Sequence, residues 1–400
     1  MLAIQMKQKE SNSVINILLH TSLFSLSSTF FAPVISIYLA EELSVSPFLI
    51  GFYFFLSMIS STVISQYLAH RSDKNLSRKT IIQFSSLIAS TGCILFAMSE
   101  SYFSILLFGA IFVSVSSAAV PQLFAIMREL NQHESTAITL SLQRAVISIS
   151  WVIGPAISFT LLNHLGYKWV FVISAILYFI SFLLSFSIQK KESPCNTKTI
   201  KLKSLFITSR RVSSLAVAFI LLYAAVNMYT ITLPLYIVQT LSLDIAFVGL
   251  LMGFAALLEV PLIIFSGYAV KKFNGEILLI VGMILGLVFY IILPHLESKT
   301  SLIVFQFFNA SLIGVTSSVG LIIFQNLLPQ NVGTASALYN NAIRVGMGFG
   351  AILTGVVINF YGNTGVLYAC GVLTVSAIFI LLIPYKRKIY VQLRNYYGDL

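Results

Sequence analysis

The 400-residue chain is 58% hydrophobic and only 9% charged, and its mean hydropathy is +0.92. Because soluble chains carry about 25% charged residues, this composition excludes a water-soluble fold and requires apolar surface that faces lipid. The net charge of +11 does not indicate a nucleic-acid partner, because the Lys and Arg residues stand in short runs between apolar stretches. The three cysteines form no CxxC or Cys/His spacing and predict neither a disulfide nor a metal site.

Apolar segments long enough to cross a bilayer follow one another along the whole chain. A helix needs roughly 20 apolar residues to span the hydrocarbon core. Cutting the chain wherever charges or turn residues interrupt such runs predicts twelve transmembrane helices, and hence an all-α integral membrane protein. In the first half they cover residues 14–40, 48–69, 80–98, 102–127, 137–163 and 167–188. In the second half they cover residues 212–239, 246–270, 277–295, 301–327, 333–359 and 365–384.

Lys and Arg residues are concentrated on one side of these spans. Twenty of them lie in alternate loops and at the termini, whereas only Lys168 and Lys299 lie in the loops of the other side. Since basic residues stay in cytoplasmic loops, both termini are predicted to be cytoplasmic. The longest polar stretch, with seven basic residues, lies on the same side. We therefore expect an N-terminal six-helix bundle (1–188), a cytoplasmic linker (189–211) and a C-terminal six-helix bundle with a short cytoplasmic tail (212–400).

Several features recur at an offset of about 200 residues, which indicates a duplicated six-helix unit. Pro33 matches Pro234, Gly51 matches Gly249, the basic cluster around Arg71 matches Lys271 and Lys272, and Arg144 matches Arg344. Because the linker stands at the midpoint, the two bundles are predicted to be pseudo-symmetric. A cavity between two such bundles would be a transport pathway.

Three charged side chains lie well inside predicted spans, namely Arg144, Glu259 and Arg344. Burying each of them costs at least a few kcal/mol unless it is paired or faces water. At about 1.5 Å of rise per residue, all three lie near the middle of the membrane. One interpretation places Arg144 and Glu259 in the transport pathway, and the other makes them a structural ion pair. Arg344 suits a pathway and a structural role equally well.

Polar side chains also recur at helical spacing, so that each set shares one helix face. They are Arg144 with Trp151, Asn227 with Thr230, Gln306 with Asn309, and Asn341 with Arg344. Amides, hydroxyls and aromatic rings with few charges suit a neutral polyhydroxylated ligand such as a sugar. The alternative for each single residue is a polar contact that holds two helices together. Gly346, Gly348 and Gly350 predict close helix packing.

No pattern in the chain indicates an enzyme. A nucleotide-binding GxxxxGK[ST] motif is absent, so ATP is not expected to drive the protein. His20, His133 and His164 have no obvious Cys, Ser or Asp partner in the sequence. We therefore expect no catalytic residues, no metal and no cofactor.

The loop after the second predicted span carries Arg71, Asp73, Arg78 and Lys79 and resembles a loop of the major facilitator superfamily. Lys271 and Lys272 resemble its second copy. More specific stretches are similar to the bacterial sugar efflux transporter family: Pro47-Phe48-Leu49-Ile50-Gly51, Pro121-Gln122-Leu123-Phe124-Ala125, Trp151-Val152-Ile153-Gly154-Pro155, Asn227-Met228-Tyr229 and Glu259-Val260-Pro261. Gly154-Pro155 also resembles part of a motif typical of antiporters.

The resemblance implies export of a small neutral sugar or glycoside against inward proton flow. We expect alternating access and a monomer in the bacterial cytoplasmic membrane. Glu259 would carry the proton beside Arg144, since a carboxylate that loses its partner in an apolar site accepts a proton more readily. Two sets of residues complete this hypothesis. The substrate-binding set is Asn227, Tyr229, Gln122, Trp151, Gln306, Asn309, Asn341 and Arg344, and the gating-loop set is Arg71, Asp73, Arg78, Lys79, Lys271 and Lys272.

Two other functions stay open. An exporter of drugs or other amphipathic metabolites is the first, because 32 Phe and 18 Tyr suit a permissive pocket. A membrane sensor that binds its ligand without moving it is the second. A panel of competing substrates separates the first from sugar export, and transport into sealed vesicles excludes the second.

Overall fold

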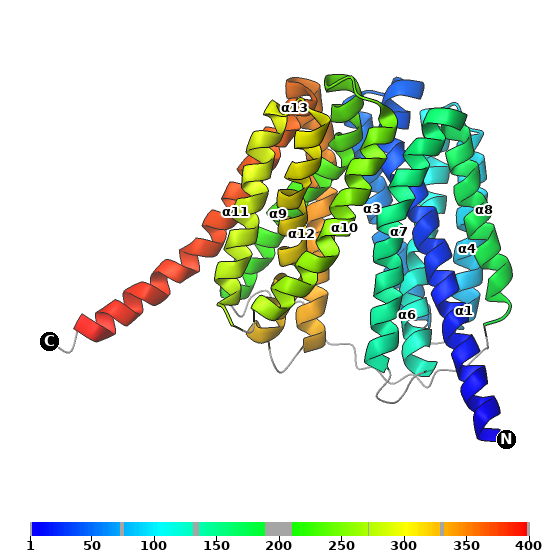
Figure 1. Cartoon of the computed structure of the whole chain (residues 1–400), viewed down its shortest axis with the longest axis horizontal. Helices are drawn as coiled ribbons and strands as arrows, with labels where there is room; N and C mark the ends of the chain where they lie inside the picture. The colour runs from blue at the N-terminus through cyan, green and yellow to red at the C-terminus, as the bar shows by residue number, and fades with distance from the viewer. Residues whose placement is uncertain are drawn as a thin grey trace. The chain divides into compact units, whose positions relative to one another are not determined.

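The computed structural model describes residues 2–72, 76–130, 136–188, 210–270, 272–328 and 332–397, and these residues are almost entirely helical (Figure 1). The helices of the first half are α1 (Leu2–Phe31), α2 (Ile35–Ile37), α3 (Pro47–Ser72), α4 (Arg78–Ala97), α5 (Tyr102–Ile105), α6 (Ala119–Leu130), α7 (Thr136–Leu165) and α8 (Tyr167–Ser185). Those of the second half are α9 (Arg210–Leu235), α10 (Ile245–Ala269), α11 (Gly275–Ile292), α12 (Lys299–Leu327) and α13 (Val332–Tyr397). Short 3-10 and π-helical turns, Ala32–Val34, Tyr38–Glu42, Leu106–Phe112, Val113–Ala118, Tyr236–Thr240 and Leu293–His295, extend or join them.

Eleven helical segments among the described residues are long and apolar enough to cross a membrane. The last of them, Leu338–Leu382, is 45 residues long. Within it Gly362 has a φ of 68°, which breaks the helix. This break falls between the predicted spans 333–359 and 365–384, so the eleven segments account for all twelve predictions. The predicted all-α membrane fold is confirmed.

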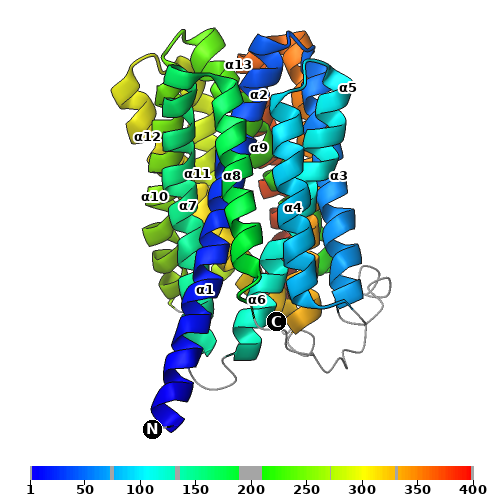
Figure 2. The same cartoon turned by 90° about the vertical axis from the view of Figure 1, so that its right-hand side faces the viewer.

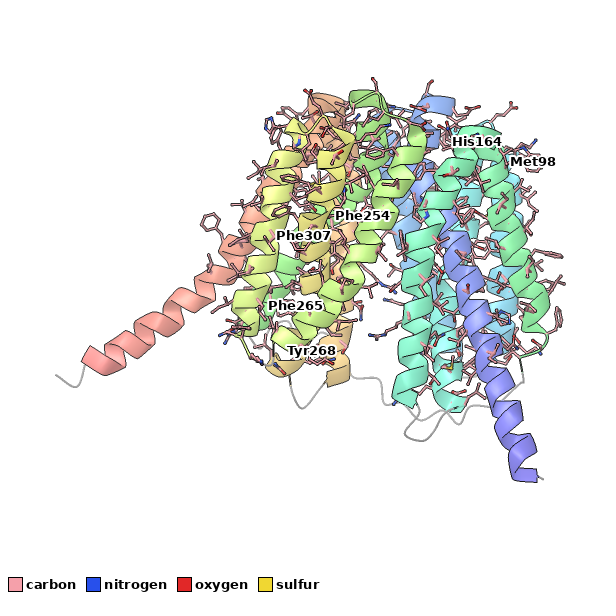
Figure 3. All side chains as sticks on the ribbon, viewed as in Figure 1. Met98, His164, Phe254, Phe265, Tyr268 and Phe307 are labelled. Carbon is pink, nitrogen blue, oxygen red and sulfur yellow. The ribbon has the colours of Figure 1, made fainter. Side chains whose placement is uncertain are left out.

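Large apolar side chains are exposed along many of these spans, as lipid contact requires. Met98 and Phe265 are both 69% exposed, and Phe307 is 47% exposed. Figure 3 shows side chains of this kind projecting from the helices. In water such a surface would be unfavourable, whereas in a bilayer these side chains contact lipid hydrocarbon instead of water.

Contacts between Cα atoms divide the chain into two compact units. The first unit comprises residues 1–197 together with Leu233–Leu257, and the second comprises residues 198–232 together with residues 258–400. The contact-based boundaries therefore run through α9 and α10, whereas the sequence predicts a single boundary at the linker. The linker lies outside the described residues except for Arg210 and Arg211, and the predicted division into 1–188, 189–211 and 212–400 stays a prediction.

The core of the first unit forms where α1 packs against α7 and α8, and α8 packs against α4 (Figure 2). Phe24 on α1 meets Tyr178 on α8 with ring centroids 5.4 Å apart. One layer further along, the rings of Phe31 and Phe96 both contact the ring of Phe171, with centroid distances of 5.4 Å and 4.7 Å. Edge-to-face aromatic pairs of this kind contribute about 0.5–1.5 kcal/mol each beyond their burial.

The core of the second unit contains a close contact between α9 and α13. A Cβ atom added to Gly346 would lie 2.4 Å from the carbonyl oxygen of Ile220, and one added to Gly350 would lie 2.4 Å from that of Ala224. Only glycine permits this approach, because any larger residue would push the two backbones apart. The close packing predicted for this glycine pair is confirmed.

Two turns of the first unit repeat the same local structure. The chain leaves Tyr38–Glu42 through Leu43 and Ser44, and it leaves Tyr236–Thr240 through Leu241 and Ser242. Ser44 and Ser242 have φ angles of 51° and 52°, and no other non-glycine residue described has a positive φ. The two described glycines with positive φ, Gly166 and Gly362, follow the equivalent helices of the two halves. All four positive-φ positions thus follow the repeat predicted from the sequence.

Candidate functional site

Three of the predicted substrate-binding residues meet in the second unit. The hydroxyl of Tyr229 on α9 lies 3.3 Å from Oε1 of Gln306 on α12 and 3.2 Å from Nε2 of the same amide. Nδ2 of Asn309, one turn further along α12, donates to Gln306 Oε1 at 3.2 Å. All three side chains are at least nine-tenths buried. The i, i+3 spacing of Gln306 and Asn309 therefore does place two amides on one buried face.

Polar atoms without a partner surround these three residues. Oδ1 of Asn309, Oγ1 of Thr232 and the hydroxyl of Tyr290 are buried and make no hydrogen bond to the described residues. Thr232 lies one turn after Tyr229 on α9, and the ring of Tyr290 on α11 lies 6.0 Å from that of Tyr229. We call Tyr229, Thr232, Tyr290, Gln306 and Asn309 the Tyr229 cluster. It offers donors and acceptors that a hydroxylated molecule could satisfy.

Thr232 and Tyr290 are not among the substrate-binding residues predicted from the sequence. Thr232 shares a helix face with Tyr229, and this i, i+3 spacing was a signal that could have been used. Tyr290 comes from a different helix, and nothing in its local sequence distinguishes it from an ordinary core tyrosine. Its place in the cluster depends on how α11 packs against the rest of the unit.

Glu259 lies on α10 in the second unit and is partly buried. The Tyr229 cluster belongs to the same unit. No described side chain of the second unit forms an ion pair with it. Pro261, two residues later, lies inside the helix and leaves a backbone carbonyl of the preceding turn without its usual partner. Glu259 thus stands beside a local break in helix hydrogen bonding.

Arg144 and Trp151 lie on α7 in the first unit, and both are exposed in the structure. Arg144 and Glu259 therefore belong to different units. Their pairing stays a prediction. Asn341 and Arg344 lie one turn apart on α13 of the second unit, and both are half-buried. Asn227 is also in the second unit, where its Nδ2 donates to the backbone oxygen of Met347 at 2.7 Å.

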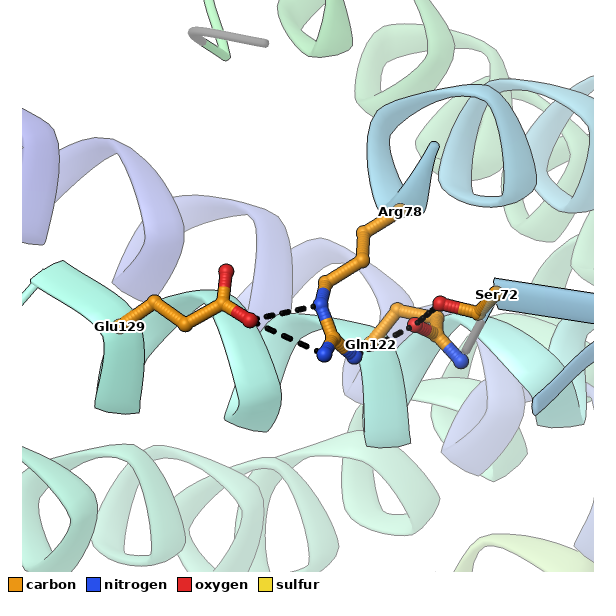
Figure 4. A network of polar contacts seen from close by, with 4 residues as sticks. All are labelled: Ser72, Arg78, Gln122 and Glu129. Carbon is orange, nitrogen blue, oxygen red and sulfur yellow. Dashed lines mark hydrogen bonds and ion pairs between the residues drawn. The ribbon is translucent and has the colours of Figure 1, made fainter. Parts of the chain in front are cut away.

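Gln122 is placed differently from the other predicted substrate-binding residues. Its Oε1 accepts hydrogen bonds from Ser72 Oγ at 2.9 Å and from Arg78 Nη1 at 3.2 Å. The same guanidinium pairs with Glu129, with Nε and Nη2 at 3.0 and 2.9 Å from Oε1 (Figure 4). Ser72, Arg78, Gln122 and Glu129, here called the Arg78 network, tie the end of α3 and the start of α4 to α6. Gln122 thus contacts a gating-loop residue.

Two other predicted gating residues of the first unit, Lys79 and Arg71, also lie at helix ends. Lys79 Nζ donates to the carbonyl oxygens of Phe186 and Ile188, both at 2.7 Å, just beyond the end of α8. A lysine in this position satisfies carbonyls that a helix terminus leaves free. Arg71 Nε bonds the hydroxyl of Tyr67 at 3.1 Å. Lys272 is exposed, while Asp73 and Lys271 lie outside the described residues.

Comparisons with known proteins agree with this architecture. The model of the Major Facilitator Superfamily matches residues 17–301 and 215–393. Sugar efflux transporter A of Escherichia coli (strain K12) is 32% identical over 355 residues, which cover 87% of this chain and 90% of that protein. Sugar efflux transporter A of Dickeya chrysanthemi is 33% identical over 350 residues, covering 86% and 89%. The crystal structure of nucleoside transporter NupG superposes with a TM-score of 0.82 at 13% identity, covering 94% of this chain and 99% of that one.

The membrane-spanning helices and the family match together define a multi-pass membrane transporter that acts on a small molecule and is not an enzyme. The chain belongs to the Major Facilitator Superfamily and, within it, to the family of the sugar efflux transporters.

Proposed function

We propose that this protein exports a small neutral sugar or glycoside across the bacterial cytoplasmic membrane. The Tyr229 cluster carries this proposal. It combines two amides, three hydroxyls and aromatic rings, and it contains no charged side chain. Such a set suits hydroxyl groups and sugar rings better than it suits an anion or a cation. The names of the two relatives support the same substrate class.

The remaining predicted substrate-binding residues would contribute from the surrounding helices. Asn227, Asn341 and Arg344 come from α9 and α13 of the second unit, and Trp151 from α7 of the first. Gln122 would act on the gating loops through Arg78, since its amide oxygen already accepts two hydrogen bonds. In the proposed cycle the two bundles open alternately, and both termini stay in the cytoplasm. We propose that one copy of the chain suffices.

Proton antiport would provide the driving force, with Glu259 as the carrier. A carboxyl group inside a membrane span is costly while it is charged, and neutralisation by a proton removes that cost. Pairing with Arg144 would stabilise the charged form, and separation of the pair would favour proton uptake. The partly buried position of Glu259 in the same unit as the Tyr229 cluster supports a coupling between the proton and that cluster.

The experiment that tests this function is transport into inverted membrane vesicles. Labelled lactose, glucose and a thiogalactoside are offered with and without an imposed pH gradient. Sugar accumulation that collapses when protons equilibrate is the expected result. Gradient-driven uptake of a cationic dye, without movement of any sugar, would replace sugar export by drug export. Binding without uptake of any compound would contradict transport altogether.

Glu259→Gln separates the proton step from the transport step. The variant keeps the size and the hydrogen-bonding capacity of the side chain but cannot bind or release a proton. We expect it to lose accumulation driven by the pH gradient while it still folds and exchanges sugar at equilibrium. Gradient-driven accumulation at the wild-type rate would refute the role of Glu259.

A further inference from the structure

The first unit contains a buried histidine that the proposed function does not use. His20 on α1 is fully buried, although it lies within the membrane-spanning segment Ser13–Glu42. Its Nδ1 lies 3.0 Å from Oγ of Ser181 on α8, whereas its Nε2 has no hydrogen-bond partner among the described residues. The sequence suggested no partner for this histidine, and packing supplies the Ser181 hydroxyl. A buried ionisable side chain inside a membrane span is expensive, and such residues are usually functional.

The next residue of α1 binds a second incompletely paired side chain. Nε2 of Gln143 on α7 donates to Oγ1 of Thr21 at 2.9 Å, and the Thr21 hydroxyl donates to the carbonyl oxygen of Ile17 at 2.9 Å. Oε1 of Gln143 is buried and makes no hydrogen bond to any described residue. One level of the α1, α7 and α8 packing therefore contains both an unpaired imidazole nitrogen and an unpaired carbonyl oxygen.

This set of groups matches the two protonation states of an imidazole. A neutral histidine has one donor and one acceptor nitrogen, whereas a protonated histidine has two donors and needs two acceptors. The Ser181 hydroxyl can accept from Nδ1 in either state. The amide oxygen of Gln143 is an unpaired acceptor on a helix that packs against α1, and the Thr21 contact holds that amide beside the residue after His20.

The helices packed against α1 carry few competing charges at this level. α1 contacts α6, α7 and α8. Tyr178 on α8 is fully buried, one turn from Ser181, and its ring contacts Phe24. Glu129 on α6 pairs with Arg78. The other titratable groups described on these helices are all at least partly exposed, namely Arg128, Arg144, His164, Tyr167 and Lys168. A proton on His20 would therefore meet hydrogen-bonding groups and no buried carboxylate of these helices.

We propose that His20 is a second proton-binding group of the transport cycle, in which Ser181 positions Nδ1 and Gln143 receives the hydrogen of the protonated Nε2. The proton adds to the free lone pair of Nε2 and leaves from the same atom. Gln143 and Ser181 are positioning residues, since they act only through the imidazole. This inference rests on the proposed proton antiport and extends it from Glu259 in the second unit to a residue of the first.

Transport by purified protein in liposomes tests the proposal. His20→Gln can still bond Ser181 but cannot bind a proton, and His164→Gln makes the same change at an exposed histidine of α7. We expect His20→Gln to lose sugar accumulation driven by the pH gradient and to keep sugar exchange without a gradient. His164→Gln should keep both. If the wild type responds to the gradient and His20→Gln responds equally, His20 is excluded while antiport stands. If the wild type itself does not respond, proton antiport and the role of His20 both fail.

A spectroscopic measurement supports the test without altering His20. The chain has five histidines, so replacing His70, His133, His164 and His295 by Gln leaves His20 as the only imidazole. We expect the NMR signal of its labelled ring to change protonation state within the pH range of transport and to shift when sugar binds. Gln143→Leu should move this titration, which a purely structural glutamine would not do. A ring that stays neutral at every pH, with and without sugar, would overturn the proposal.

Discussion

The Arg78 network and the Tyr229 cluster are both built from side chains of several helices, yet they differ in how completely their polar atoms are paired. In the Arg78 network one guanidinium bonds both Glu129 and Gln122, and Ser72 completes the set. In the Tyr229 cluster three buried polar atoms have no partner among the described residues. A complete set of bonds holds helix ends together, whereas an incomplete one leaves capacity for a ligand. The difference supports the proposal that the Arg78 network stabilises the structure and that the Tyr229 cluster binds substrate.

The largest effect is expected from Asn309→Leu in the Tyr229 cluster. The variant removes the hydrogen bond to Gln306 and the free Oδ1. A sugar hydroxyl would then lose its partner, which would weaken the free energy of sugar binding by about 1–3 kcal/mol. The initial rate of labelled-sugar transport at low concentration should fall by about tenfold to a hundredfold. Asn340→Leu is the matched control, because Asn340 is exposed and its amide donates to the backbone oxygen of Ser336 in its own helix. Equal transport by the two variants would contradict a binding role for the cluster.

Glu129→Gln should affect stability more than substrate affinity. It removes the charge that pairs with Arg78, and hydrogen bonds to charged groups contribute about 1.5–3 kcal/mol when they are partly buried. Thermal unfolding of the purified protein should show a lower midpoint with an unchanged affinity for sugar. Reversing the pair, with Arg78→Glu and Glu129→Arg together, should recover part of the loss. A single variant as stable as the wild type would remove the structural role assigned to the network.

Tyr102 and Tyr290 test the same difference, because the first hydroxyl is hydrogen-bonded and the second is not. The hydroxyl of Tyr102 donates to the carbonyl oxygen of Leu49 at 2.7 Å, whereas that of Tyr290 has no hydrogen-bond partner among the described residues. Tyr102→Phe should therefore lose about 0.5–1.5 kcal/mol of stability. Tyr290→Phe should unfold like the wild type but bind sugar more weakly. The opposite pattern in unfolding and binding measurements would place the ligand elsewhere.

The smallest effect is expected for Lys79→Gln at the end of α8. Losing a cation at a helix C-terminus costs about 0.3–1 kcal/mol at low ionic strength, and salt screens part of it. The unfolding midpoint should fall slightly in low salt, and the difference should shrink in high salt. Lys272→Gln, which changes an exposed lysine of the second half, should have no measurable effect. If the unfolding midpoint of Lys79→Gln fell equally in low and high salt, the packing of Lys79 rather than its charge would account for the lost stability.

The sequence predicted the fold better than it predicted the site. Span positions follow from hydropathy, because the bilayer requires a long apolar run for each crossing, and the break at Gly362 fell where polar residues interrupted the pattern. Gln306 and Asn309 were found together because they are neighbours on one helix. Gln122 could not be assigned to the Arg78 network, since its partners lie 44 and 50 residues away in the chain. Contacts over such separations depend on how the helices pack.

One repeated signal was present in the sequence but was not used. Tyr38 and Tyr236 are each followed, five and six residues later, by a leucine and a serine, and both serines adopt the left-handed conformation. This conformation is uncommon for residues other than glycine, asparagine and aspartate, so local composition does not predict it. Only comparison of the two halves reveals it.

The positive-φ turns belong to alternate connections of the chain, which the predicted topology puts on the non-cytoplasmic side, and all of these connections are described and short. They are the stretches between Glu42 and Pro47, Ala97 and Tyr102, Thr240 and Ile245, and His295 and Lys299, together with the single breaks at Gly166 and Gly362. Proteases need an extended segment of several residues to enter their active sites, and such segments are found mainly in long loops and at termini. A protease added to this side of a sealed membrane would find almost nothing to cut. Digestion of the intact protein should therefore reveal which way round the transporter has been inserted.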